Sequence, residues 1–288
     1  MNEWTIKGAD DQIIRCSTDL PLKTPRCIVL LAHGFKGYKD YGFIPLLAES
    51  LTETGAIVHR FNFSHSGMGE NIDTFEFPEL FEKDTWNKQV YDLEVLLERA
   101  VSGSLPHTPK GLPVVLAGHS RGGGTCLLTA GRLFRDKSDF LPAGVITMSA
   151  PDKTCTLGRT TQQMLLADGR LRSPSSRTGQ DLYVGADWLK EQLLAPEDHD
   201  LMQLCGYIIC PVIALHGRAD VTVPCIAADN IAAACPDGIS VFINEGNHVY
   251  NTPNPADPEA PISPQLESLV THIQTFLNEK IVAATIEK

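Results

Sequence analysis

The sequence has no apolar run long enough to cross a membrane, because none of its stretches approaches about 18 uninterrupted apolar residues. It also has no CxxC pair and no HExxH motif, which removes the support for a structural zinc site or a zincin active site. No internal repeat and no low-complexity tract interrupts the chain. We therefore expect a protein without a membrane span, a metal or an organic cofactor.

Positive charge is scarce as well. The 24 lysines and arginines stand against 35 aspartates and glutamates, which gives a formal net charge of −11. This balance would repel a phosphate backbone, so we expect no nucleic-acid partner. The eight cysteines have irregular spacings that do not indicate a disulfide framework. The opening MNEWTIKGADDQ lacks the apolar core of a signal peptide, so we expect a cytoplasmic location with reduced thiols.

Six short apolar runs lie between turn residues and are typical of strands buried on both faces of a sheet. The runs are CIVLLAHG (27–34), AIVHRFN (56–62), PVVLAG (113–118), GVITMSA (144–150), PVIALHG (211–217) and ISVFIN (239–244). The stretch WTIKGADDQIIRCST near the N-terminus alternates instead and predicts an antiparallel hairpin at the edge of the sheet.

Helical periodicity separates these runs. One helical spacing begins at Ile44, another at Val90 and a third at Leu266. The alternation of strands and helices predicts an α/β protein with a mainly parallel central sheet and helices on both faces. Because 43% of its 288 residues are hydrophobic, the chain can bury a large core.

The segment 152–205 breaks the alternation, because it contains no convincing core strand. Its TTQQMLLADGRL and DWLKEQLLA stretches favour helices, and the polar RSPSSRTGQ lies between them. We interpret the segment as a small helical lid inserted into an α/β core made of residues 1–151 and 206–288. An ordinary crossover of unusual length is the alternative interpretation.

The sequence PVVLAGHSRGGG (113–124) joins a predicted strand to a predicted helix through a serine between two glycines. A hard turn at Ser120 would bring the strand and the helix so close that only residues such as Gly118 and Gly122 fit beside it. The hydroxyl would then stand above the sheet at the positive end of the helix. This is the G-x-S-x-G pattern of a nucleophilic serine, and it differs from the GxGxxG pattern of dinucleotide-binding proteins.

A serine hydroxyl needs a base before it can act as a nucleophile. Asp220 in LHGRADVTVP and His248 in INEGNHVY each follow a predicted strand, so that both should reach the carboxyl edge of the sheet. We therefore expect Ser120 as the nucleophile, His248 as general base and acid, and Asp220 as the residue that orients the imidazole. Glu245 is the alternative acid.

Together the motifs VLLAHGF, AGHSRGG, HGRADVTVP and GNHVY resemble those of the α/β-hydrolase superfamily, and the resemblance covers nearly the whole chain. It implies the α/β-hydrolase fold and a serine hydrolase activity. The short lid after ITMSAP is similar to that of cinnamoyl and feruloyl esterases and of related small carboxylesterases. The loop NFSHSGMGE departs from the acidic or arginine-bearing loop that the family often has, which leaves its role open.

Five further residues are assigned roles around the triad. The backbone N–H groups of Phe35 and Arg121 are expected to form the oxyanion hole. His65, Met164 and Trp188 are the expected substrate contacts. The alternatives are a hydrogen-bonded loop histidine for His65 and packing of the lid onto the core for Met164 and Trp188.

We therefore predict a carboxylesterase that acts on a small-molecule ester through an acyl-enzyme intermediate, with no metal and no cofactor. A peptidase or thioesterase with the same triad is the first alternative, and the lid residues Asp187 and Glu191 are the acidic side chains that would favour a peptidase. A ligand-binding protein that has lost turnover is an alternative of another class. A monomer and a homodimer both stay open.

Overall fold

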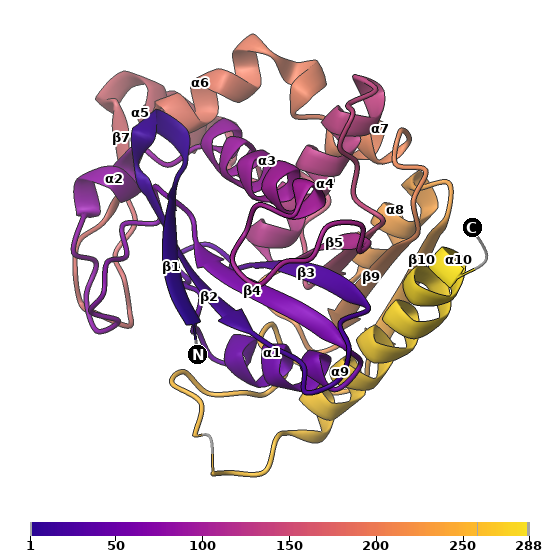
Figure 1. The fold of residues 1–288 in the computed structure, drawn as a ribbon. Coiled ribbons are helices and arrows are strands. Elements are labelled where there is room, and N and C mark those ends of the chain that lie inside the picture. The colour runs from indigo at the N-terminus through magenta and orange to yellow at the C-terminus, as the bar shows by residue number, and fades with distance from the viewer. Residues whose placement is uncertain (1, 258, 287–288) are drawn as a thin grey trace.

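A computed structural model of the chain describes residues 2–257 and 259–286, and its central feature is an eight-stranded sheet (Figure 1). The strands follow the spatial order β1-β2-β4-β3-β5-β6-β9-β10. Their bounds are β1 Asn2–Lys7, β2 Ile13–Asp19, β3 Cys27–Ala32, β4 Ala56–Asn62, β5 Val114–His119, β6 Gly144–Met148, β9 Val212–Gly217 and β10 Gly238–Ile243. All six strands predicted from apolar runs are present, and the predicted α/β architecture is confirmed.

The first two strands form the antiparallel hairpin that the alternating pattern predicted. β1 pairs with β2 across the 3₁₀ turn η1 (Ala9–Asp11), and β2 pairs antiparallel with β4. The other neighbouring pairs, from β4 to β10 across the sheet, are parallel. Parallel strands bring their carboxyl ends to one edge of a sheet, so the loops after β5, β9 and β10 are gathered there.

Helices cover both faces of the sheet (Figure 1). α3, α4, α7 and α8 belong to the core cluster on one face, and α1, α9 and η3 belong to the cluster on the other. The bounds are α1 Ile44–Thr52, α2 Pro78–Glu82, α3 Trp86–Ser102, α4 Arg121–Arg135, α7 Leu201–Cys205, α8 Ile226–Ala234, α9 Pro264–Phe276, the π-helical η3 Leu277–Val282 and α10 Ala283–Ile286. Within the described residues, no helix combines the length and the apolarity that crossing a membrane requires.

Successive residues of the central strands pack alternately into these two clusters. In β3, Ile28 and Leu30 belong to the cluster beneath α3 and α4, and Val29 and Leu31 belong to the cluster beneath α1 and α9. All four side chains are fully buried. Because successive side chains of a strand point to opposite faces, a strand without polar residues needs a helical layer on each side. Each such side chain contributes about 1.5–3 kcal/mol when it leaves water.

The segment between β6 and β9 folds partly on its own. It contains α5 (Arg159–Asp168), β7 (Arg170–Arg172), β8 (Tyr183–Gly185), α6 (Asp187–Leu194) and η2 (Pro196–Asp198), followed by α7. The two predicted helices are α5 and α6, whereas the polar stretch between them belongs to an antiparallel hairpin, β7–β8, which the sequence did not predict. Leu165, Ala186 and Leu189 form a small core within the segment. Leu204 of α7 lies instead in the cluster around α4, and the division at residue 205 stays a prediction.

The turn from β5 into α4 depends on the close approach of two glycines. A Cβ atom at Gly118 would overlap the carbonyl group of Gly122, and a Cβ atom at Gly122 would overlap the carbonyl oxygen of His33. The obstacles are backbone atoms, which cannot rotate away as a side chain can. Strand, turn and helix can therefore meet at this point only if both positions lack a side chain.

Replacing Gly118 with alanine is expected to lower the free energy of unfolding by about 1–3 kcal/mol, because the methyl group overlaps the backbone of Gly122. Urea denaturation measures the change. Gly158→Ala is the control, since its Cβ atom would meet nothing within 4 Å and its φ of −64° suits alanine. The control should change the stability by less than about 0.5 kcal/mol. Equal effects of the two substitutions would contradict the close approach.

Candidate active site

Ser120 occupies the turn between β5 and α4, with φ at 52° and ψ at −122°. A positive φ is uncommon for a residue other than glycine and persists only where the surrounding structure enforces it. The N–H of Ser120 donates to the carbonyl of Met148 at 2.7 Å, and its own carbonyl accepts the N–H of Gly123 at 2.9 Å. The turn is thereby tied to β6 and to α4, and the serine stands at the positive end of that helix.

Asp220 is the centre of a hydrogen-bond network at the ends of β9 and β10. Its Oδ2 atom accepts a hydrogen bond from Nδ1 of His248 at 2.8 Å and another from Nε2 of His216 at 3.1 Å. Its Oδ1 atom accepts the backbone N–H groups of Thr222 at 2.8 Å and Val223 at 3.0 Å. Four donors therefore converge on one carboxylate whose side chain is fully buried.

This network determines the charge of Asp220. Burial alone raises the pKa of the carboxyl group, but hydrogen bonds from His216 and His248 outweigh it and hold the pKa well below its ordinary value. An ionised carboxylate only accepts hydrogen bonds, so Nδ1 of His248 carries a proton and Nε2 is the basic nitrogen. Glu245, the alternative acid, is exposed. Asp220, and not Glu245, accepts the hydrogen bond from Nδ1 of His248.

Two histidines that the sequence did not single out support this arrangement. His119, directly before the serine, donates from Nε2 to the backbone carbonyl of His248 at 2.8 Å, and the two rings lie 4.8 Å apart. Burial lowers the pKa of His119 to about 3, so its ring is neutral and acts through its hydrogen bond and its shape. His216 ends β9 and shares Asp220 with His248. The only sequence signal for either residue is its nearness to a predicted catalytic residue.

The loop after β3 passes directly beside the serine. A Cβ atom at Gly34 would lie 3.1 Å from the Cβ atom of Ser120, and both Phe35 and Arg121 line a cavity with Ser120. The N–H of Arg121 belongs to the first turn of α4, where the helix itself supplies no acceptor. His33 orders this loop, because its Nδ1 donates to the carbonyl of Gly34 at 2.8 Å. Burial lowers the pKa of His33 to about 4, so the ring is neutral.

The side chain of Arg121 is buried beneath the same loop. It forms an ion pair with Asp84 at 3.2 Å, and its guanidinium lies 4.8 Å from the centre of the Trp86 ring and 5.6 Å from that of Phe35. Burial raises the pKa of Asp84 to about 6, and the charge of Arg121 opposes that rise. The positive side chain of Arg121, next to Ser120, therefore has a counter-charge within the protein.

A largely apolar cavity of about 360 Å³, here called the Trp188 cavity, opens on one side of Ser120. Its lining includes Trp86, Leu157, Leu171, Val184 and Trp188. Four of these five side chains come from the segment between β6 and β9, and Trp86 begins α3. The cavity thus lies between that segment and the body of the protein.

A second cavity of about 230 Å³, here called the His248 cavity, is also lined by Ser120. Ser120, Phe35, His248, Lys36 and Arg177 are among its lining residues. His248 lines this cavity and not the Trp188 cavity, although Ser120 and Phe35 line both. Ser120 therefore lies at the junction of an apolar and a basic chamber, and His248 lines the basic one.

The structure separates the three predicted substrate contacts. Trp188 lines the Trp188 cavity, whereas Met164 is 52% exposed and lines neither chamber. His65 is buried, lies 2.9 Å from the hydroxyl of Ser64 and 3.3 Å from the ammonium of Lys88, and also lines neither chamber. Its contacts are those of a hydrogen-bonded loop histidine.

The two acidic residues considered for a peptidase subsite lie elsewhere. Asp187 forms an exposed ion pair with Lys190 at 3.0 Å, and Glu191 contacts His199 at 3.4 Å. Neither carboxylate lines the chambers beside Ser120. Asp187 and Glu191 therefore supply no acidic subsite next to the nucleophile.

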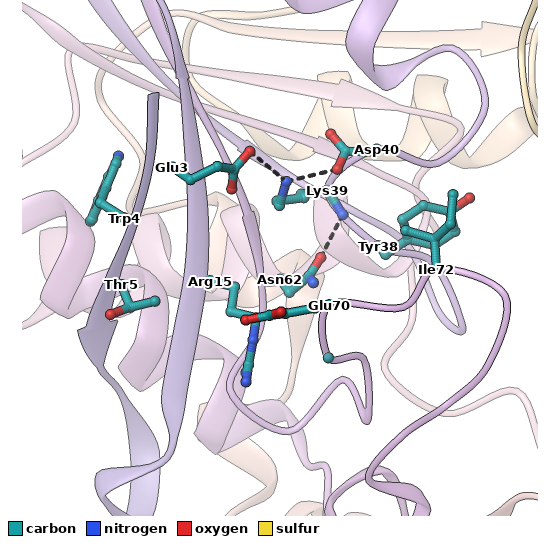
Figure 2. A pocket seen from close by; sticks show the side chains of 11 residues that line it. Glu3, Trp4, Thr5, Arg15, Tyr38, Lys39, Asp40, Asn62, Glu70 and Ile72 are labelled. Carbon is teal, nitrogen blue, oxygen red and sulfur yellow. Dashed lines mark hydrogen bonds and ion pairs between the residues drawn. The ribbon is translucent and has the colours of Figure 1, made fainter. Parts of the chain in front are cut away.

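A third cavity, of about 430 Å³, lies beside the N-terminal hairpin, and Ser120, Asp220 and His248 do not line it (Figure 2). Figure 2 shows Lys39 in its wall between Glu3 and Asp40, with which it forms ion pairs of 3.2 Å and 2.7 Å. The positive charge of Lys39 is therefore already compensated. In the part of the chain that the structure describes, no cluster of three or more His, Cys, Asp or Glu side chains could hold a metal ion.

No family profile and no curated protein matches the chain by sequence. Among solved structures it is similar to Est1E from Butyrivibrio proteoclasticus with bound ferulic acid, at a TM-score of 0.69 and 17% identity, covering 98% of this chain and 99% of that one. It is similar to α/β-hydrolase domain-containing protein 10 from mouse, at a TM-score of 0.65 and 18% identity, covering 97% and 99%. It is also similar to monoglyceride lipase from Saccharomyces cerevisiae with a substrate analogue, at 0.68 and 18%, covering 97% and 95%.

These similarities extend over nearly the whole of each chain at low identity, so they report on the fold. The protein has the α/β-hydrolase fold, as the sequence motifs predicted. The sheet order, the antiparallel start and the helices on both faces agree with that assignment.

The charge of Asp220 should be visible in the pH dependence of stability. Its pKa is lowered in the folded protein, while an unfolded aspartate titrates near about 3.9, so its contribution is complete above about pH 5 and declines as the pH falls below about 4. Asp220→Asn lacks this titration. We expect wild type to exceed Asp220→Asn in unfolding free energy by about 1–3 kcal/mol near pH 7, with a smaller difference near pH 3. Urea unfolding at both pH values tests this; a difference that does not change with pH would contradict it.

Proposed function

We propose that the protein is a serine hydrolase that cleaves carboxylic esters through an acyl-enzyme intermediate. The observation that carries this proposal is the 2.8 Å bond between Oδ2 of Asp220 and Nδ1 of His248, beside a cavity that His248 and Ser120 line together. Nucleophile, base and orienting acid come from three separate loops in the order Ser, Asp, His. A binding site alone would not need all three.

In the first half of the reaction, Oγ of Ser120 attacks the ester carbonyl while Nε2 of His248 takes the hydroxyl proton. The bond from the carbonyl carbon to the alcohol oxygen then breaks, and His248 returns the proton to that oxygen. Water next attacks the acyl group on Ser120 with the help of the same nitrogen, which releases the acid and restores the serine. Asp220 stays ionised and stabilises the imidazolium that forms in each half.

The negative charge on the carbonyl oxygen is stabilised by the backbone N–H groups of Phe35 and Arg121. Two features support this assignment: Arg121 begins α4, whose first N–H groups have no acceptor within the helix, and Phe35 lines both chambers at the serine. The ion pair with Asp84 compensates the side chain of Arg121, so its N–H can serve without its guanidinium.

The two chambers divide the substrate between them. The imidazole must reach the departing oxygen, and His248 lines only its own cavity, so the alcohol part belongs there. The acyl part then occupies the Trp188 cavity, whose apolar wall suits a hydrocarbon or aromatic acid. Because the segment 152–205 supplies most of that wall, we interpret it as the lid of the acyl chamber.

The similar structures support an ester substrate, since Est1E holds ferulic acid and the monoglyceride lipase holds a substrate analogue. A thioesterase or peptidase with the same triad is the alternative within enzymes, and a non-catalytic binding protein is the alternative outside them. Rates on p-nitrophenyl esters, acyl-CoA thioesters and aminoacyl amides distinguish an esterase from a thioesterase and from a peptidase. A cytoplasmic location stays a prediction, as does the choice between monomer and homodimer.

A fluorophosphonate probe is expected to label Ser120, because an activated serine attacks its phosphorus atom. Ser120→Ala and His248→Ala should abolish labelling and lower kcat on p-nitrophenyl butyrate by more than about a thousandfold, and Asp220→Asn should lower it about ten-thousandfold. Intact-protein mass spectrometry and steady-state rates provide the readouts. Wild-type protein that is folded by circular dichroism yet stays unlabelled would favour the non-catalytic alternative.

His119→Ala should lower kcat by about 10–100-fold without abolishing it, because the loop that carries His248 loses the hydrogen bond to its carbonyl and the imidazole is placed less accurately. His272→Ala, an exposed substitution on α9, is the matched control. Labelling of Ser120 should slow in proportion to kcat. If the two variants behave alike, His119 has no positioning role.

A further inference from the structure

The His248 cavity contains two cationic side chains and no carboxylate among its lining residues. The cations are Lys36, which follows Phe35 in the loop after β3, and Arg177, which lies between β7 and β8. Over residues 2–257 and 259–286, neither side chain forms an ion pair with an acid. A basic chamber beside the nucleophile is unexpected in a chain with a net charge of −11.

Two other cations that this protein buries, Lys39 and Arg60, are paired with acids. Lys39 pairs with Glu3 and Asp40, as Figure 2 shows, and the fully buried Arg60 pairs with Asp19 at 2.8 Å. Burying a charge without a counter-charge is costly, which explains these pairs. The two cations of the His248 cavity differ from Lys39 and Arg60 in having no such partner, so the cavity can accept a negative charge from outside.

Arg177 is held in place by contacts that leave its charge uncompensated. Its guanidinium lies 5.0 Å from the centre of the Tyr38 ring and 5.1 Å from that of Phe75. It donates to the carbonyl of Ile72 and, at 3.4 Å, to the sulfur of Met68. Its Nε atom is buried and has no hydrogen-bond partner. Neutral acceptors and aromatic rings therefore fix the side chain, and one buried donor is left over.

The loop that carries Arg177 is fixed at both ends. The N–H of Ser175 donates to the carbonyl of Gln180 at 2.9 Å, which closes the loop on itself. The side chain of Gln180 accepts the N–H of Phe75 at 2.8 Å and donates to its carbonyl at 3.0 Å. The backbone around Arg177 is thus ordered before any ligand arrives, which lowers the entropic cost of binding.

The ammonium of Lys36, which lines the same chamber, has hydrogen-bond donors that no protein group uses. Its ammonium gives one hydrogen bond of 2.8 Å to the carbonyl of Pro174, in the same loop as Arg177. An ammonium carries three donors, so two remain for a ligand. Burial lowers the pKa of Lys36, and a bound anion would favour its protonated form.

We propose that the alcohol part of the natural ester carries an anionic group, a carboxylate or a phosphate, which binds between Lys36 and Arg177 in the His248 cavity. The inference rests on the proposed ester hydrolysis, because the imidazole of His248 assigns this chamber to the leaving alcohol. Both cations can donate charge-assisted hydrogen bonds to either anion. The chemistry at Ser120 is unchanged, and the anion fixes the side of the substrate from which the alcohol departs.

Three aryl butyrates test the proposal: p-carboxyphenyl butyrate, p-phosphonooxyphenyl butyrate, and the methyl ester of the first as the neutral reference. The measured quantity is the ratio of kcat/KM for a charged ester to that for the neutral one, taken relative to the same ratio in wild type, so that leaving-group reactivity cancels. Arg177→Gln and Lys36→Gln should each lower this ratio about tenfold. Arg177→Lys should retain part of it. In the wild type, added salt should lower the ratio of kcat/KM for the charged ester to kcat/KM for the neutral ester.

Arg159→Gln is the matched control, because Arg159 is exposed on α5 in the same segment and the substitution removes the same charge. The ratio should stay at the wild-type value in this variant. The charged ester that loses more in Arg177→Gln identifies the preferred anion. An unchanged ratio in both Arg177→Gln and Lys36→Gln, with the neutral ester still cleaved, overturns the inference and leaves the hydrolase intact. If wild type cleaves no ester and Ser120 stays unlabelled, the proposed function fails and this inference fails with it.

Inhibition of the wild-type enzyme provides a readout that does not depend on how the variants fold. p-Hydroxybenzoate should inhibit hydrolysis of the neutral ester about tenfold more tightly than methyl p-hydroxybenzoate, because only the first carries the anion. Equal inhibition by the two compounds would overturn the proposal even if Arg177→Gln did not fold.

Discussion

The close approach of β5 and α4 at Ser120 is the constraint on which the rest of the candidate site depends. Gly118 and Gly122 allow backbone to pass against backbone, and the hydrogen bond from Ser120 to Met148 fixes the turn against β6. The same contact brings the loop after β3 against the serine, since a side chain at Gly122 would meet the carbonyl of His33. The absence of side chains at Gly118 and Gly122 thereby positions Ser120, the proposed nucleophile, and both proposed oxyanion donors.

The buried polar groups around that turn differ in how many hydrogen-bond or ion-pair partners they have. Asp220 accepts four hydrogen bonds. His119 and His33 are neutral, and each donates a hydrogen bond to a backbone carbonyl. Arg121 has its own acid in Asp84. Nε of Arg177 is buried without a hydrogen-bond partner, and Arg177 lines the His248 cavity. Polar groups without partners are costly inside a protein, so their position is informative about function.

Much of the fold could be predicted because strands such as β3, buried on both faces, have to be continuous apolar runs. The triad could be proposed because each member follows a strand and the order suits this fold. The hairpin β7–β8 could not, since its strands are three residues long and include charged and exposed side chains. Met164 shows the same difficulty, because its neighbour Leu165 and not Met164 faces the core of the segment. Lys36 and Arg177 line the same chamber although they are far apart in sequence, and no local pattern predicts this.

The segment between β6 and β9 contributes to both chambers, with Trp188 in one and Arg177 in the other. It is a single continuous stretch, and its strands β7 and β8 form a sheet separate from the eight-stranded one. An insertion or recombination event confined to this stretch would therefore change the walls of both chambers in one step, while Ser120, Asp220 and His248 lie outside it. If the two chambers hold the two parts of an ester as proposed, selectivity for both parts is inherited together.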